Sequence, residues 1–365
     1  MTTLTEASRQ WSTRPDEERF TSLPAMLAAA EYSRQHSRQA VVSSRRLQAV
    51  PTDDNRGILI EGPNGHGYAP THFSFGQLAT LVQAPAGYLR QLPAPMAADC
   101  INYGLQVSRD VEEVGVLITR AEHEATGSLR AATGPKYGRV WNSDVIRALI
   151  ERFGDGVTGA FRVPGEFGRA VTVSKENTTL FASDRDCFVF LADEENRIEL
   201  PNRRNGETGT LARGFFVTNS EVGAGALKVK TFLFDYVCKN RIVWGAEHVQ
   251  DIAIRHTAGA PDRFIEQVQP ALIEYANSSA HGITAALQAA QAARLDDKVG
   301  DFLSRRFGPR VAAKMQAAHV LDEGRPVETV WDAVTAATAY ARSIPYTADR
   351  VELETQAGAM LELVR

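Results

Sequence analysis

The chain has 365 residues, a formal net charge of −4 at pH 7 and a pI near 6.1. Its hydrophobic content of 44% and charged content of 23% are ordinary for a globular protein with a sizeable core. The weak negative charge excludes a surface coated with cations for nucleic acid or membranes, but it leaves room for a local basic surface. Three cysteines, Cys100, Cys187 and Cys238, are too few and too scattered for a disulfide framework or a zinc site, and we predict no metal and no cofactor.

The sequence also bears on the compartment. No apolar run approaches the ~18–20 residues that a membrane-spanning helix needs. The segment Met1–Asp16 is polar and lacks the apolar stretch of a secretory signal. We therefore expect a cytoplasmic protein without a membrane partner.

The first third of the chain predicts a loosely ordered segment followed by a small β-rich unit. Residues 1–35 offer only a short helical patch over Leu23–Ala30. Residues 36–112 predict a β-hairpin plus helices, because the apolar period changes towards two and Asn64-Gly65 is typical of a hairpin turn. The expected elements are strands over Val41–Val50, Gly57–Glu61 and Gly67–Phe73, a helix over Ser74–Val82 and a second helix after Pro85.

Residues 113–260 predict an α+β core. Its expected elements are strands over Val114–Thr119, Ser128–Ala132, Leu180–Ala182, Cys187–Leu191 and Gly214–Thr218, and a helix over Ser143–Phe153. Residues 231–241 fit both a strand, with alternate residues on one face, and a helix. We favour a strand through Lys230 and then a short helix that Thr231 caps and Asn240 closes.

Residues 261–365 predict an α-helical C-terminal region punctuated by proline and glycine. The expected helices cover Ile283–Arg294, Lys298–Phe307, Arg310–Val320, Val327–Ile344 and Thr347–Val364. The fold class that follows is α+β, with a mixed, mainly antiparallel sheet core, packed helices and this helical region after it.

Familiar catalytic motifs are absent from the sequence. It has no P-loop, no dinucleotide-binding glycine turn and no nucleophile elbow. Asp184 and Asp186 would point to the same side of an extended segment and could hold a magnesium ion, as metal-dependent nucleases require. The alternative is a polar turn before the apolar strand that follows.

A cationic and aromatic segment lies between Leu200 and Gly245. Seven basic and three acidic residues give it a net charge of +4, so the rest of the chain carries −8. Its aromatic residues could stack on unpaired bases, or they could belong to the core while the cations form an ordinary solvated face. The basic residues are Arg203, Arg204, Arg213, Lys228, Lys230, Lys239 and Arg241.

A second candidate is the glycine-flanked segment Gly134–Asn142. It carries Lys136, Tyr137 and Arg139 directly before the predicted helix over 143–153. The N-terminus of a helix attracts anions, so this loop could hold a phosphate while Tyr137 stacks on a base.

Several stretches together resemble family 932 of the domains of unknown function, often labelled phage- or plasmid-like proteins. The resemblance covers roughly residues 75–365, implies a mobile-element context and brings no accepted catalytic residues. The matching stretches are Lys136–Asn142, Thr179–Asp186, Gly214–Gly223, Tyr236–Asn240, Ala341–Tyr346 and Glu354–Gly358.

We therefore expect a protein that binds single-stranded DNA or RNA, as a recombination or annealing accessory by analogy alone. A homo-oligomer is an open alternative to a monomer, and we lean towards a protein that is not an enzyme. Two other hypotheses remain open: a metal-dependent nuclease or hydrolase using Asp184 and Asp186, and a host-interaction protein that docks through residues 261–365.

Overall fold

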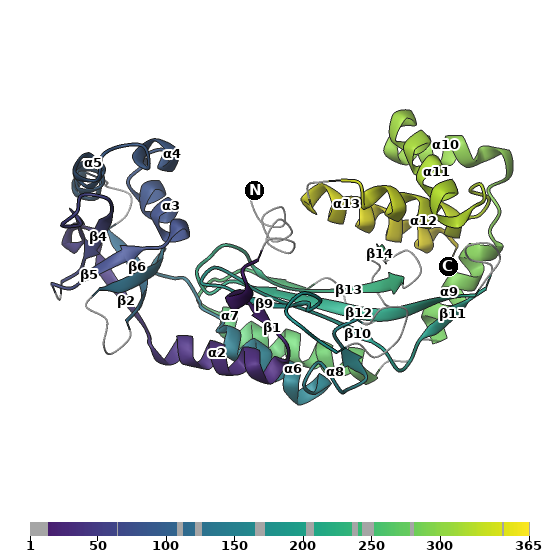
Figure 1. Ribbon diagram of the computed structural model, residues 1–365, viewed down its shortest axis with the longest axis horizontal. Helices are drawn as coiled ribbons and strands as arrows, with labels where there is room; N and C mark the ends of the chain where they lie inside the picture. The colour runs from purple at the N-terminus through teal and green to yellow at the C-terminus, as the bar shows by residue number, and fades with distance from the viewer. Residues whose placement is uncertain are drawn as a thin grey trace.

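The computed structural model describes residues 14–63, 65–107, 112–120, 126–164, 172–201, 208–235, 240–242, 252–277, 281–344 and 347–364. It has the predicted α+β fold, with two mainly antiparallel sheets and a helical C-terminal region (Figure 1). The smaller sheet and its helices form one end of the molecule, the larger sheet forms the middle, and helices α10–α13 form the other end.

The smaller sheet has six strands in the order β2-β6-β7-β5-β4-β3, and only the pairing of β5 with β7 is parallel. Helices α3 (His72–Leu81) and α5 (Ala94–Val107) pack on it around a shared apolar core. We call residues 37–133 the N-terminal lobe. Its strands are β2 (Ser37–Ser43), β3 (Gln48–Pro51), β4 (Ile58–Glu61), β5 (Gly67–Pro70), β6 (Glu113–Thr119) and β7 (Gly127–Thr133), and a short helix, α4, covers Ala86–Leu89.

The predicted hairpin is present, since Glu61 of β4 pairs with Gly67 of β5. The expected boundary between residues 112 and 113, however, falls inside this lobe. Strand β6 pairs with β2 along its full length, from Ser37↔Thr119 to Ser43↔Glu113. The strands expected to open the core therefore complete the first sheet.

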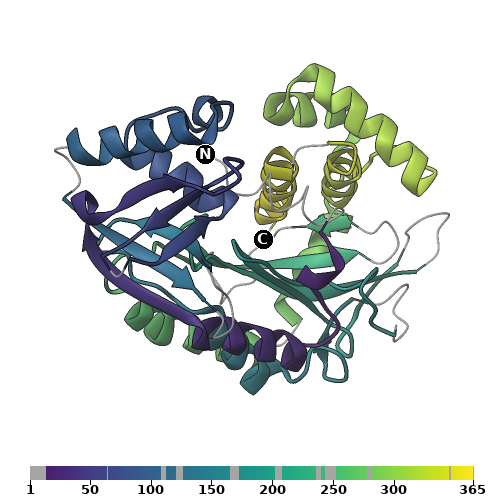
Figure 2. The ribbon, with the colours of Figure 1, turned by 60° about the vertical axis from the view of Figure 1, so that its left-hand side comes forward.

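The larger sheet has nine strands, and its main path runs β1-β9-β10-β12-β13-β14. Helices α2 (Leu23–Gln35), α6 (Asn142–Phe153), α7 (Ala260–Arg263) and α8 (Gln269–Asn277), with the one-turn π-helix η4 (Phe264–Val268), cover one face of it. Figure 2 shows α2 running along this face beside α6. The strands are β1 (Arg19–Phe20), β8 (Phe161–Arg162), β9 (Leu180–Ala182), β10 (Cys187–Asp193), β11 (Ile198–Leu200), β12 (Gly209–Asn219), β13 (Leu227–Asp235), β14 (Asn240–Ile242) and β15 (Ile252–Ile254).

Helix α2 corrects the expectation that residues 1–35 are loosely ordered throughout. Ser22 caps the helix by accepting a hydrogen bond from the backbone N–H of Ala25. Leu23 and Met26 are fully buried against the larger sheet. Tertiary burial thus extends a helical patch that is short in the sequence pattern alone.

The helix expected from Thr231 to Asn240 is wrong over Thr231–Asp235, and residues 236–239 lie outside the described residues. Residues Leu227–Asp235 form one strand, β13, which pairs with β12 from Thr218↔Lys228 to Leu211↔Asp235. The period of two continues past Lys230, and a long neighbouring strand satisfies the backbone of this segment. Pairing with β12 therefore decides between strand and helix for this segment, a choice that the sequence pattern left open.

The helical C-terminal region confirms the expected helices and packs on the end of the larger sheet. Its core includes Ile198 of β11, Leu211 of β12 and the fully buried Trp331. A capping box between Thr329 and Asp332 begins the central helix. The helices are α9 (His281–Ala292), α10 (Val299–Phe307), α11 (Pro309–Glu323), α12 (Val330–Ala341) and α13 (Thr347–Ala359). Across the described part of the chain, no helix has the length and apolar character needed to cross a bilayer.

Candidate functional site

An open groove of about 770 Å³ lies where the N-terminal lobe meets the helix-covered face of the larger sheet. It is bounded by α2, α6, the loop 134–141 and the segment 258–269. The polar and aromatic residues that line it are Arg34, Gln39, Lys136, Tyr137, Arg139, Trp141, Asp144, Arg147, Glu151, Phe264 and Gln269. The predicted candidate loop is therefore one wall of this groove.

A close backbone contact fixes this loop. The N–H of Gly138 donates to the carbonyl oxygen of His256 at 3.1 Å, and Tyr137 forms a β-bridge with Thr257. A Cβ atom on Gly138 would lie 1.9 Å from the carbonyl oxygen of Thr257. Only glycine allows this approach, which holds the flanking side chains in place.

Arg139 is the most unusual side chain of the groove. It is 8% exposed, its guanidinium lies 5.2 Å from the Tyr137 ring centre and 5.7 Å from that of Trp141, and its Nε donates to Gln39 at 3.3 Å. Its buried Nη1 has no hydrogen-bond partner, and no carboxylate among the described residues forms an ion pair with it. Burial lowers the pKa of this guanidinium. The site thus holds a desolvated cation whose hydrogen-bonding capacity is unfilled.

The other cations of the groove differ in how far they are already neutralised. Arg34 and Arg147 both pair with Asp144, at 2.6 and 3.1 Å, and Arg147 also pairs with Glu31 at 2.7 Å. Lys136 is exposed and has no ion pair with any described residue. Positive charge available to a ligand is therefore concentrated at Lys136 and Arg139.

Tyr137 supports the site rather than offering a free platform. Its hydroxyl donates to the carbonyl oxygen of Ser220 at 2.8 Å, and its ring stacks on His256 with 5.1 Å between ring centres. Burial raises the pKa of the Tyr137 hydroxyl, so it stays a hydrogen-bond donor. Trp141 is a half-buried aromatic side chain at the groove wall.

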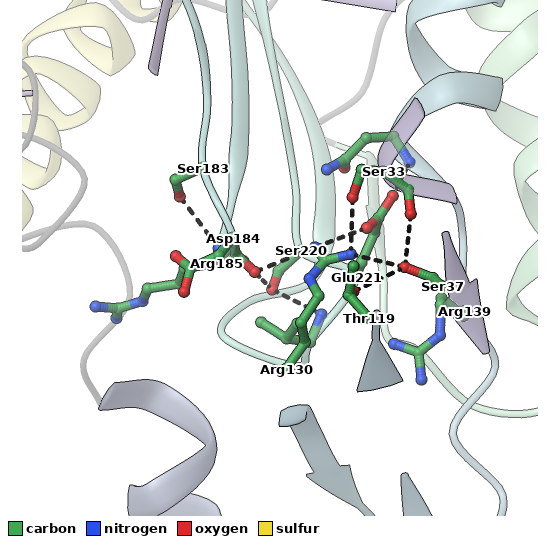
Figure 3. A network of polar contacts seen from close by, with 12 residues as sticks. Ser33, Ser37, Thr119, Arg130, Arg139, Ser183, Asp184, Arg185, Ser220 and Glu221 are labelled. Atoms are coloured by element: carbon green, nitrogen blue, oxygen red, sulfur yellow. Dashed lines mark hydrogen bonds and ion pairs between the residues drawn. The ribbon is translucent and has the colours of Figure 1, made fainter. Parts of the chain in front are cut away.

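A buried polar network lies directly behind the loop (Figure 3). Arg130 donates to Glu221 at 3.0 Å, to Ser33 at 3.1 Å and to the carbonyl oxygen of Asp184 at 3.2 Å. Glu221 also accepts the backbone N–H of Asn142, the first residue of α6, at 2.8 Å. The anion expected at the start of this helix is thus a carboxylate of the protein itself, and a ligand phosphate has no place there.

Arg213 is not on a binding face, contrary to expectation. It is 4% exposed, and its Nε lies 2.9 Å from the buried carboxylate of Asp193. Strand alternation places Arg213 on the same face of β12 as Phe215 and Val217, under helix α8. Phe215 and the neighbouring Phe216 are also buried, so these aromatics belong to the core.

Of the remaining cations of the basic segment, the two that the structure describes, Lys228 and Lys230, do not line the groove. Leu227 and Val229 of β13 point into the core beneath the helices. Lys228 and Lys230 are half-buried and lie on the other face of the strand. Arg203, Arg204 and Lys239 lie outside the described residues, as does the side chain of Arg241.

Asp184 and Asp186 lie in the turn that precedes strand β10. Asp186 pairs with Arg14 at 2.7 Å and accepts a hydrogen bond from Ser183 at 2.9 Å, in a turn at the start of β10. Within the described ranges, no group of three histidine, cysteine or acidic side chains could hold a metal ion. The polar-turn interpretation accounts for the carboxylate of Asp186.

Comparison with known proteins adds a family. The profile of a family described as "Domain of unknown function (DUF932)" matches residues 169–357, more than half of the chain. The chain belongs to this family. No curated protein and no solved structure matches it. The DUF932 match runs from β9 to α13 and reaches the groove through segment 258–269, while loop 134–141 precedes it.

Most residues of the groove were not predicted from the sequence, and Arg34, Arg147 and Trp141 are the most important of them. Arg34 lies on α2, Arg147 lies on α6, and Trp141 stood in a matching stretch without a role. The helical spacing of Leu23, Met26 and Ala30 would have predicted α2 had it been extended to Gln35. The meeting of α2 with α6 is a tertiary contact, which no local pattern contains.

Proposed function

We propose that this protein binds single-stranded nucleic acid and that the groove is its working face. The observation that carries the proposal is Arg139, a buried guanidinium with an unpartnered nitrogen in a groove that also holds Lys136. A buried guanidinium without an ion-pair partner costs free energy, and a bound phosphate would supply the missing acceptor and add to the favourable charge of Glu221.

The groove also has surfaces suited to unpaired bases. Trp141 is half-buried, and the guanidinium of Arg34 lies 5.2 Å from its ring centre. Bases stack on aromatic rings and on guanidinium planes alike. A base in a duplex has both faces covered by its neighbours, so the groove favours a single strand.

The test is fluorescence anisotropy of a labelled single-stranded oligonucleotide and of its duplex across a salt series, with and without magnesium. We expect tighter binding of the single strand, weakening as salt rises because phosphate contacts release counter-ions. Preference for the duplex would contradict the proposal, and so would the absence of binding at low salt. Cleavage that requires magnesium would favour the nuclease hypothesis instead.

A further inference from the structure

We propose that the groove binds the end of a strand, by holding a terminal phosphate monoester against Arg139. This inference rests on the proposed function and narrows it. A site that binds the middle of a strand and a site that binds its end both need cations. The first needs a row of cations without ion-pair partners along the backbone, and the second needs them at one position.

The groove offers one phosphate position rather than a track. Its uncompensated cations, Lys136 and Arg139, lie three residues apart in one loop. Along the α6 wall, Arg34 and Arg147 are already paired with Asp144 and Glu31, and the exposed Glu151 adds negative charge. A second phosphate of the same strand would meet carboxylates there, so a continuous backbone is repelled beyond the first position.

The burial of Arg139 favours a monoester over a diester. A terminal monoester carries about −1.5 to −2 charge at pH 7, whereas an internal diester carries a single charge. The difference matters more to a cation that is 8% exposed than to a solvated one, because water screens the interaction less.

The experiment compares three oligothymidylates of equal length with an internal fluorophore: one with a 5′-phosphate, one with a 3′-phosphate and one with hydroxyl groups at both ends. Each is titrated with the full chain, with Arg139→Gln and with Arg305→Gln. Arg305 is an exposed cation of α10 away from the groove and serves as the control. Circular dichroism of each variant confirms that it is folded.

We expect one terminal phosphate to tighten binding about tenfold in the wild type and in Arg305→Gln, and not in Arg139→Gln. The end that responds identifies the 5′ or the 3′ terminus as the ligand. Equal affinity for all three probes, or a preference that survives in Arg139→Gln, would overturn end binding and leave strand binding intact. No binding of any probe would instead contradict the proposed function.

Discussion

Glu221 and Arg130 form a buried ion pair, with 3.0 Å between Oε2 and Nη2, and it joins the two sheets. Arg130 belongs to β7 of the N-terminal lobe, and Glu221 lies two residues after the end of β12 of the larger sheet. The second oxygen of Glu221 accepts the N–H of Asn142, so one carboxylate also fixes the start of the helix that walls the groove. The groove is therefore built on a polar junction between sheets.

Replacing Glu221 by glutamine should destabilise the protein strongly. The change keeps the shape but leaves Arg130 buried without a counter-charge, which costs about 3–5 kcal/mol. The matched control is Glu31→Gln, which breaks the half-exposed pair with Arg147 and should cost at most about 1 kcal/mol. Urea unfolding measures both values, and similar losses for the two variants would show that the junction is not a major source of stability.

Gly138→Ala should disturb the groove loop, because its Cβ would overlap the carbonyl oxygen of Thr257. We expect a loss of about 1–3 kcal/mol in urea unfolding. Gly134→Ala, at the other end of the loop, has no atom within 4 Å of the added Cβ and should change stability little. Equal effects of the two substitutions would contradict the proposed packing of loop 134–141 on segment 255–258.

Two buried arginines should respond in opposite ways to methionine. Arg213→Met leaves the carboxylate of Asp193 buried and unpaired, and we expect a loss of about 3–5 kcal/mol. Arg139→Met removes a buried cation that has no carboxylate partner, so stability should stay within about 1 kcal/mol or rise. Thermal and urea unfolding test the contrast. A comparable loss in both variants would mean that Arg139 is structural, which would weaken its assignment as a ligand-binding residue.

His256 should make stability fall with acidification. Burial lowers its pKa from the ordinary value of 6.5, and the nearby Arg139 acts in the same direction. The unfolded chain therefore takes up the proton first, so stability is lost as pH falls through about 6.5. We expect His256→Phe to lose less stability than the wild type between about pH 7 and pH 5. The exposed His72→Gln is the control, and unchanged pH dependence in His256→Phe would contradict the argument.

Local sequence patterns predicted those elements whose structure depends mainly on their own residues. The hairpin at residues 58–70, helix α6 and the C-terminal helices each follow from turn residues or a helical apolar period. Strand β13 was mispredicted because its period of two competes with a helical spacing, and only the neighbour β12 resolves the choice. Local sequence does not contain that neighbour.

The site was predicted in part for the same reason. The loop with Lys136 and Arg139 stands out as a cationic segment between glycines, and the structure places it on the groove. Charge alone could not separate Arg139 from Arg213, since both are buried and only Arg213 meets a carboxylate. That difference depends on Asp193, twenty residues away in sequence and adjacent only across the sheet.

The most direct test of the account is the salt dependence of single-strand binding in Arg139→Gln, beside Arg305→Gln and the Lys228→Ala/Lys230→Ala double variant. If the groove is the working face, Arg139→Gln weakens binding and lowers the slope of log affinity against log salt by about 0.7, the value for one lost phosphate contact on a single strand. Arg305→Gln should leave both quantities unchanged. Unchanged binding in Arg139→Gln would contradict the groove as the binding face. If only the Lys228→Ala/Lys230→Ala variant has a smaller salt slope, nucleic acid binds instead on the face of β13 that carries these two lysines.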